Sequence, residues 1–198
     1  MLFYLKMTYP IHIMNKVKTI LNSILKIDNK ILNKLYKYKD NFFINIIACL
    51  GNIIFIILII ILVFILPINH GKNISIISFI SLLLNTLIIF IIKFTVRRKR
   101  VYENNPLLIN VETYSFPSGH INRISSLIIP FFYYPFFSLF LLILSMAVGF
   151  ARMAKGYHFL SDCVVGFLIG IVLGYFVSLF SYIYIDSALN ILNILKII

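Results

Sequence analysis

Long apolar runs are the feature that most limits what this chain can fold into. Residues 42–66 are apolar almost throughout and end at Pro67, and similar runs cover residues 74–92, 121–151 and 163–184. About 20 helical residues cross a hydrocarbon core, so each run is long enough to span a membrane. The sequence therefore predicts an all-α integral membrane protein.

The composition agrees with this prediction. Of the 198 residues, 61% are hydrophobic and 12% are charged, and the mean hydropathy is +1.01. Soluble domains are nearer to half apolar and a quarter charged, so a water-soluble globule is excluded, as is a disordered chain. The two cysteines, Cys49 and Cys163, lie in apolar runs and suggest neither a disulfide framework nor a metal site.

Prolines and polar junctions divide the runs into about five spans. The run 121–151 contains Pro130 and Pro135 and is too long for one helix, so it predicts a hairpin of two short spans that turns near residues 133–137. The polar stretch 93–120 predicts a long loop, which in a compact protein is often functional. We expect a bundle of about five transmembrane helices.

The first 41 residues precede this bundle, which we assign to residues 42–198. In residues 11–40, apolar side chains recur every three or four positions and most lysines fall off that stripe. The stripe consists of Ile13, Val17, Ile20, Ile24, Ile27, Ile31 and Leu35. This pattern predicts a basic amphipathic helix in the membrane interface, with a short coiled coil as the alternative.

Positive charge is abundant and unevenly distributed. Lys and Arg number 18 against 6 acidic residues, for a net charge of +12. In a membrane protein this excess indicates anionic headgroups, a topology signal or an anionic substrate, and we expect no nucleic-acid partner. With five spans, all basic residues except Lys72 and Lys196 fall on one side, which the positive-inside rule assigns to the cytosol.

Three polar clusters on that side contain the candidate functional residues. They are Lys93 with Arg100, then Ser118, Gly119 and His120, and finally Arg152, His158 and Asp162. Lysine and arginine side chains suit a phosphate dianion, and a serine and a glycine before a helix start offer main-chain N–H groups to it. The clusters therefore predict an anion site formed by Lys93, Arg100, Ser118, Gly119 and Arg152.

The histidines supply the predicted chemistry. His158 and Asp162 are four positions apart, so on a helix they share a face and the carboxylate can orient the ring. His158 would then attack phosphorus, and His120 would protonate the leaving oxygen. No cluster suits a metal, so we expect no cofactor and assign charge stabilisation to the basic residues.

Each cluster alone also has an ordinary explanation. The basic run 97–100 is typical of a helix end at a membrane surface, and residues 117–119 are typical of a turn. A histidine at a helix end is more often structural than catalytic. The occurrence of all three clusters in order and on one side favours a functional site.

The three clusters resemble the signature of the type 2 phosphatidic acid phosphatase (PAP2) superfamily, K-x6-R-P, P-S-G-H and S-R-x5-H-x3-D. The resemblance covers about residues 74–178 and implies a chloroperoxidase-like helical core and a metal-independent phosphatase that forms a phosphohistidine on His158. Val101 stands where the family has Pro, and Ala151 where it has Ser. These differences predict reduced or altered activity rather than an inactive site, because every charged and imidazole group of the signature is present.

Within the superfamily, residues 96–100, residues 114–120 and Arg123 are similar to the polyisoprenoid (presqualene) diphosphate phosphatase branch. That resemblance implies a polyprenyl diphosphate or monophosphate substrate. It also implies that the protein lies in the endoplasmic reticulum or nuclear envelope membrane if the source is a eukaryote. In a bacterium, the expected location is the plasma membrane. Bacterial members of similar size act on undecaprenyl diphosphate, phosphatidylglycerol phosphate or lipid A phosphate, so these substrates and phosphatidic acid stay open.

The leading functional hypothesis is a membrane lipid phosphate phosphatase with its site on the cytosolic face. The alternative is a catalytically weak or inactive membrane scaffold of the same fold. A channel or transporter has little support, because the spans contain no acidic residue and no repeated broken helix.

Overall fold

The computed structural model describes residues 11–100 and 114–194, with side chains for residues 15–100 and 114–181. Its elements are α2 (Ile11–Leu35), η1 (Tyr36–Tyr38), α3 (Phe42–Cys49), α4 (Ile53–Ile65), α5 (Gly71–Val96), α6 (Gly119–Ile128), α7 (Pro135–Ala154) and α8 (Leu160–Ile194). Within the described residues, the only pairing of strand type is an isolated bridge between Lys99 and Tyr114. The predicted all-α membrane bundle is thus confirmed.

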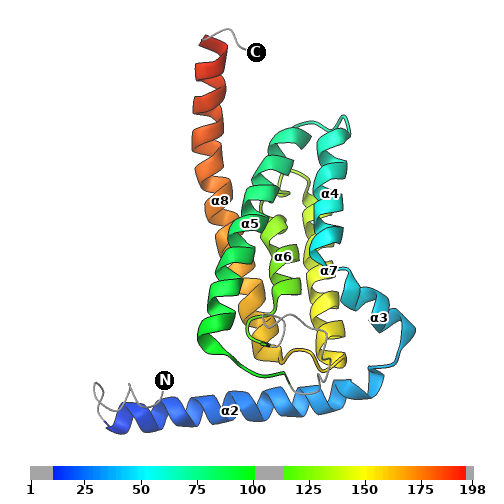
Figure 1. Ribbon diagram of the computed structural model, residues 1–198, viewed down its shortest axis with the longest axis vertical. Helices are drawn as coiled ribbons and strands as arrows, with labels where there is room; N and C mark the ends of the chain where they lie inside the picture. Colours follow the sequence, from blue (N-terminus) through cyan, green and yellow to red (C-terminus); the bar gives the residue numbers. More distant parts are fainter. Residues whose placement is uncertain (1–10, 101–113, 195–198) are drawn as a thin grey trace.

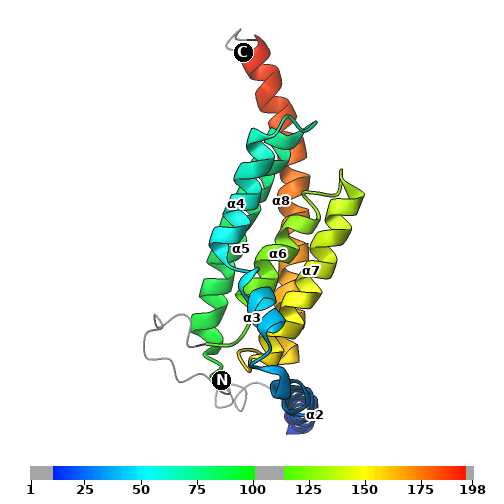
Figure 2. The ribbon, with the colours of Figure 1, turned by 90° about the vertical axis from the view of Figure 1, so that its right-hand side faces the viewer.

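The helices form an upright bundle that stands on α2. Helix α2 lies across the foot of the bundle in Figure 1 and is seen end-on in Figure 2. Helix α6 lies at the centre, in contact with α4, α5, α7 and α8, and eight of its ten residues are buried. Helix α8, with 35 residues, continues beyond the end of the other helices (Figure 1).

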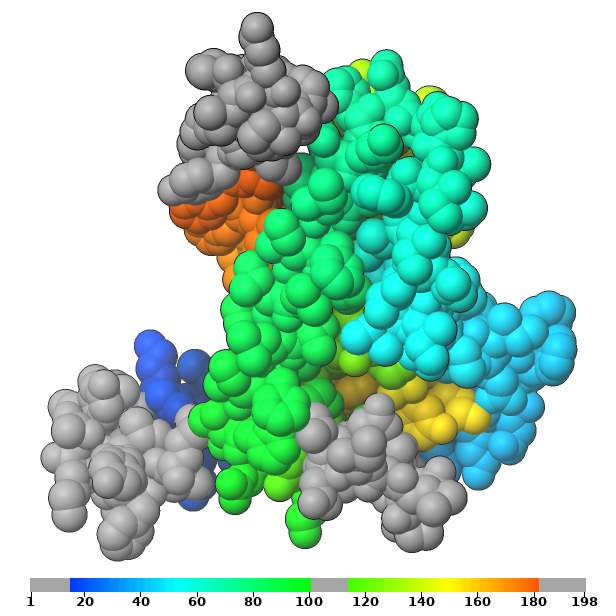
Figure 3. Space-filling view, turned by 45° about the horizontal axis from the view of Figure 1, so that its top comes forward, coloured from blue at the N-terminus to red at the C-terminus, as the bar shows by residue number. Residues whose placement is uncertain are grey.

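The apolar run 42–66 is not one straight helix. It is divided into α3 and α4, which meet at an angle of 62°. Gly51 and Asn52 interrupt the run, and the Asn52 side chain caps α4 by accepting a hydrogen bond from the Ile54 N–H at 3.3 Å. Figure 3 shows α4 beside α5, with α3 turned away at the foot of the molecule.

The number of full spans is roughly consistent with the prediction of about five. Among the described helices, Gly71–Val96, Pro135–Ala154 and Leu160–Ser181 are long and apolar enough to cross a membrane, and the bent pair of α3 and α4 makes a fourth if counted as one span. The predicted hairpin forms, but its first helix, α6, has only ten residues. At ~1.5 Å per residue it is about half as long as a ~30 Å hydrocarbon core is thick.

Three glycines of α8 allow α6 to approach closely. Gly166, Gly170 and Gly174 recur every four residues and face the α6 side, where a Cβ on Gly166 would lie 2.5 Å from the Ser118 carbonyl oxygen. Close backbone approach at small residues is a common way for membrane helices to pack. This contact fixes the start of α6 against the start of α8.

Candidate active site

One cavity at the α2 end of the bundle brings the three predicted clusters together. It has a volume of about 230 Å³ and lies among α5, α6 and the connections that precede α6 and α8. It is lined by Thr86, Ile89, Phe90, Lys93, Arg100, Gly119, His120, Asn122, Arg123 and His158. Five of the eight predicted site residues are in this lining, and the other three, Ser118, Arg152 and Asp162, adjoin it.

His158 is buried at the floor of the cavity, with 1% of its side chain exposed. Its Nδ1 lies 2.8 Å from the carbonyl oxygen of Ser115. A carbonyl oxygen only accepts hydrogen bonds, so Nδ1 carries the hydrogen of the neutral ring and the lone pair is on Nε2. Burial, together with the nearby Arg152 guanidinium, holds the pKa of His158 well below its usual range.

Asp162 lies beside His158 but does not form the direct hydrogen bond that the spacing suggested. The distance from its Oδ2 to His158 Nδ1 is 3.8 Å. Oδ2 instead accepts the Phe159 N–H at 2.9 Å, and Oδ1 accepts Arg98 Nη1 at 2.7 Å. Asp162 therefore acts on the imidazole as a nearby negative charge, while Ser115 holds the ring.

His120 is the second residue of α6 and lines the same cavity. The bend between α3 and α4 packs directly on it, since a Cβ on Gly51 would lie 2.6 Å from the Cβ of His120. Burial, followed by the charges of Arg152 and Arg123, lowers the pKa of His120 far below its usual value. Burial and these charges thus favour the neutral form of both imidazoles in the empty site.

Cations surround the two histidines. Lys93 is 7% exposed and donates from Nζ to the Tyr114 carbonyl oxygen at 2.6 Å. The guanidinium groups of Arg152 and Arg100 lie 4.4 and 5.7 Å from the centre of the Tyr157 ring, close enough for cation–π attraction. Tyr157 thus holds together two arginines that come from different polar clusters.

The N-terminus of α6 closes another side of the cavity. Gly119, the first residue of the helix, is in the lining, and Ser118 is the N-cap residue. The Ser118 N–H donates to the Asp162 carbonyl oxygen at 3.0 Å, and the buried Ser118 hydroxyl has no hydrogen-bond partner among the described residues. A helix N-terminus attracts anions, so this end of α6 suits a phosphate oxygen.

Residues that the motifs did not predict lie in the site or next to it. They are Ser115, Arg98, Arg123, Tyr157 and Asp28. Arg98 links Asp162 to Asp28 of α2, and Arg123 adds a further guanidinium to the cavity lining while its Nη1 donates to the Gly51 carbonyl oxygen at 3.2 Å. Within the described residues, no three His, Cys, Asp or Glu side chains come together in a metal-binding group.

Of the two departures from the resembled signature, Val101 lies outside the described residues. Ala151 is fully buried in α7, where it packs with Ile44 and Ala48 of α3. The side chain at this position thus contributes to the contact between α7 and α3.

One family model matches the sequence of this chain. The sequence profile of the PAP2 superfamily matches residues 75–185, a range that contains all three clusters. No curated protein sequence gives a significant match.

Two solved structures are similar in fold. The PAP2-type phosphatidylglycerolphosphate phosphatase from Bacillus subtilis has a TM-score of 0.62 and 22% identity, covering 81% of this chain and 87% of its own. LpxE from Aquifex aeolicus has a TM-score of 0.60 and 20% identity, covering 76% of this chain and 93% of its own.

Proposed function

The chain belongs to the PAP2 superfamily, and from this premise we propose that it is a membrane phosphatase that hydrolyses a lipid phosphate ester or diphosphate through a phosphohistidine on His158. The observation that carries the proposal is the cavity, in which two histidines face cations from separate segments of the chain. A nucleophile, a proton donor and an anion site are thus within one small volume.

In the first step, the phosphate lies among Lys93, Arg100 and Arg152 with an oxygen toward Ser118 and Gly119. The Nε2 lone pair of His158 attacks phosphorus, and the bond from phosphorus to the lipid oxygen breaks. The leaving oxygen keeps the electron pair and takes a proton from His120. The cations stabilise the charge on the phosphoryl oxygens, so we propose that no metal is needed.

In the second step, water replaces the imidazole on phosphorus. His120, now neutral, takes a proton from the water, the P–Nε2 bond breaks, and phosphate leaves while His158 regains its lone pair. His120 must be protonated when the cycle starts, although the surrounding cations disfavour this in the empty site. A substrate dianion offsets their repulsion, so His120 takes up its proton as the substrate binds.

A diphosphate is the substrate class that we favour. Lys93, Arg100 and Arg152 suffice for one phosphate group, and Arg123 places a further cation at the same cavity. The similarity of residues 114–120 and Arg123 to the polyisoprenoid diphosphate branch points the same way. A phosphatidic acid or phosphatidylglycerol phosphate monoester is the second candidate, supported by the fold of the Bacillus subtilis enzyme.

The test is phosphate release by the purified full-length protein in detergent with EDTA present. Farnesyl diphosphate and phosphatidic acid are offered in parallel, and His158→Ala is the matched inactive variant. We expect release that survives chelation and disappears in His158→Ala. A ³²P label from the substrate that stays on the denatured wild-type protein, is lost in acid and is absent from His158→Ala would identify the phosphohistidine.

Other results would replace the proposal. No release from either lipid by a folded wild-type protein would favour the inactive scaffold. Release that EDTA abolishes would contradict the metal-independent mechanism. A rate that is unchanged in His158→Ala would show that another group attacks phosphorus.

A further inference from the structure

Asp28 is a buried carboxylate on a helix that otherwise lies at the surface. The apolar side chains of α2 from Val17 to Ile27 are more than 40% exposed, whereas Asp28 and Leu32 are each 2% exposed. Asp28 lies one turn after Ile24, on the side of α2 that contacts the foot of the bundle. An amphipathic helix that only anchors to lipid needs no buried charge.

The Asp28 carboxylate is fully paired. Its Oδ2 accepts Arg98 Nη2 at 2.9 Å and the Ser161 hydroxyl at 2.6 Å, and its Oδ1 accepts the Ser161 N–H at 3.0 Å. The Arg98 guanidinium also lies 3.9 Å from the centre of the Phe159 ring. Burying an ion pair costs desolvation free energy, so packing alone does not explain a carboxylate at this position. Asp28 therefore points to a role beyond packing.

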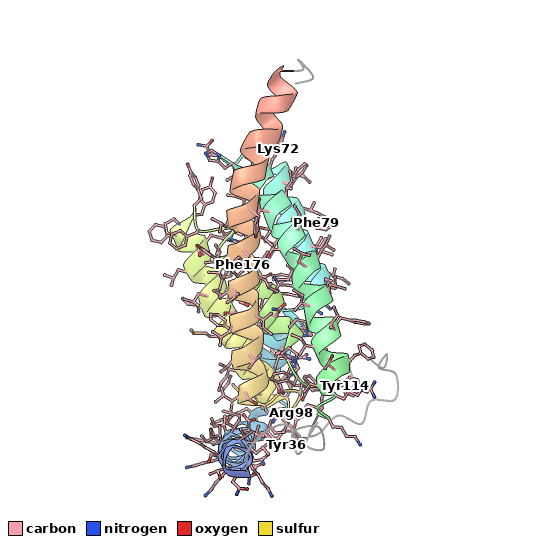
Figure 4. The ribbon with its side chains drawn as sticks, turned by 90° about the vertical axis from the view of Figure 1, so that its left-hand side faces the viewer. Tyr36, Lys72, Phe79, Arg98, Tyr114 and Phe176 are labelled. Atoms are coloured by element: carbon pink, nitrogen blue, oxygen red, sulfur yellow. The ribbon has the colours of Figure 1, made fainter. Side chains whose placement is uncertain are left out.

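Arg98 connects Asp28 with both groups that face Nδ1 of His158. Its Nη1 donates to Asp162 Oδ1 at 2.7 Å, and its carbonyl oxygen accepts the Ser115 N–H at 2.7 Å. Figure 4 shows Arg98 at the foot of the bundle, close to α2. One arginine thereby holds the charge beside His158 and the carbonyl that orients its ring.

We propose that Asp28 is a positioning residue for the active site, through which α2 fixes Arg98 and so holds Asp162 and Ser115 against His158. This inference rests on the phosphatase function proposed above. It makes α2 part of the catalytic unit, whereas the sequence pattern predicted an interfacial helix or, alternatively, a short coiled coil. Asp28 itself touches neither the cavity nor the substrate.

The competing explanation is that Asp28 only fastens α2 to the bundle. Leu32 separates the two explanations, because it is equally buried, lies one turn further along α2 and has no part in the ion-pair network. Leu32→Ala weakens the docking of α2 by loss of packing, while Asp28→Asn removes the charge with little change in volume. Asp40→Asn changes an exposed carboxylate of the same segment and serves as the neutral control.

The experiment measures kcat, KM and the thermal midpoint of the full-length wild type and the three variants in detergent. We expect Asp28→Asn to lower kcat about tenfold or more, because Arg98 then loses one of its two carboxylates, with a change in KM of less than about twofold. Leu32→Ala should lower the thermal midpoint at least as much as Asp28→Asn, with a smaller loss of kcat. Asp40→Asn should match the wild type.

If the loss of kcat in Asp28→Asn and in Leu32→Ala simply follows the drop in thermal midpoint of each variant, the inference is overturned. Asp28 is then a docking residue only. An unchanged kcat in Asp28→Asn would overturn the inference as well. An inactive wild type would instead contradict the proposed function, so the two failures are distinguishable.

Discussion

At the scale of single residues, the reactivity of His158 depends on which ring nitrogen carries the hydrogen. The Ser115 carbonyl oxygen selects the Nδ1–H form, which directs the Nε2 lone pair toward the substrate. Asp162, 3.8 Å away, affects the same ring by its charge. In the proposed mechanism, a main-chain group therefore prepares the nucleophile, and a carboxylate stabilises the positive charge that develops on it.

Arg123 is the residue that we expect to distinguish a diphosphate from a monophosphate. Arg123→Gln removes the charge but keeps a polar side chain next to the cavity. If Arg123 contacts the second phosphate group, kcat/KM for farnesyl diphosphate should fall about tenfold or more, since a charge-assisted hydrogen bond is lost. Activity on phosphatidic acid should fall much less. The ratio of the two rates, measured in one detergent, is the readout.

Arg97→Gln is the matched control for this prediction. Arg97 is an exposed arginine at the end of α5, and its Nε donates to the Phe94 carbonyl oxygen rather than facing the cavity. The Arg97→Gln variant should leave the ratio of the rates on the two substrates unchanged. An equal loss of kcat/KM on both substrates in Arg123→Gln would mean that Arg123 acts through its contact with Gly51. Arg123 would then have no part in substrate recognition.

The motifs named five of the ten residues that line the cavity, because charges and imidazoles are visible in a sequence. Ser115 was not predictable in this way, since it acts through its main-chain carbonyl. Arg98 was hidden among neighbouring arginines whose common explanation is membrane topology. Asp28 did leave a signal, as an acidic residue one turn from Ile24 on an otherwise apolar stripe.

At the scale of helices, the contact between α6 and α8 depends on the glycines at 166, 170 and 174. A Cβ on Gly170 would lie 2.6 Å from the Asn122 carbonyl oxygen and would also meet the Ser125 hydroxyl. Gly170→Ala should therefore lower the free energy of unfolding by about 1–3 kcal/mol, as overpacking does. It should also reduce activity, because α6 presents His120. Denaturant or thermal unfolding in detergent, together with phosphate release, measures both effects.

Val172→Ala is the comparison variant for Gly170→Ala. Val172 is 48% exposed on the same helix, where the change removes two methyl groups without forcing α6 away from α8. The Val172→Ala variant should have a free energy of unfolding close to that of the wild type. Equal stability of Gly170→Ala and the wild type would mean that α6 can shift without cost.

Helix existence and order could be predicted from the apolar runs, but two details could not. The break at Gly51 and Asn52 was hidden because long apolar segments lie on both sides of this pair. The Gly51 backbone fits against His120, a contact between segments far apart in the sequence. The short length of α6 was likewise hidden, because its buried Ser125 and Ser126 hydroxyls and the Asn122 amide nitrogen form hydrogen bonds inside the bundle.

At the scale of the whole molecule, charge predicts the orientation in the membrane. The polar connections around the cavity lie at the α2 end, while Lys72 lies at the opposite end, as Figure 4 shows for Arg98 and Lys72. We expect the cavity to face the cytosol. In a Cys49→Ser background, a membrane-impermeant maleimide should label Lys72→Cys in intact cells and Lys99→Cys only after permeabilisation.

Both labelled positions are exposed, so accessibility within the protein does not bias the comparison. Labelling of both variants in permeabilised cells is the control for expression and reactivity. The reverse pattern in intact cells would place the active site on the outer or lumenal side and change the pool of lipids that it meets.

The size of the cavity has a consequence for how such an enzyme encounters its substrate. A space of about 230 Å³ is smaller than the roughly 300–1,000 Å³ of pockets that enclose a drug-sized ligand. It has room for a headgroup, and Ile89 and Phe90 give one part of its wall an apolar character. Under the proposed function, the hydrocarbon tail would stay among the surrounding lipids, and turnover would follow the mole fraction of substrate in the bilayer rather than its bulk concentration. We then expect a search in two dimensions and a rate that depends little on the length of the tail.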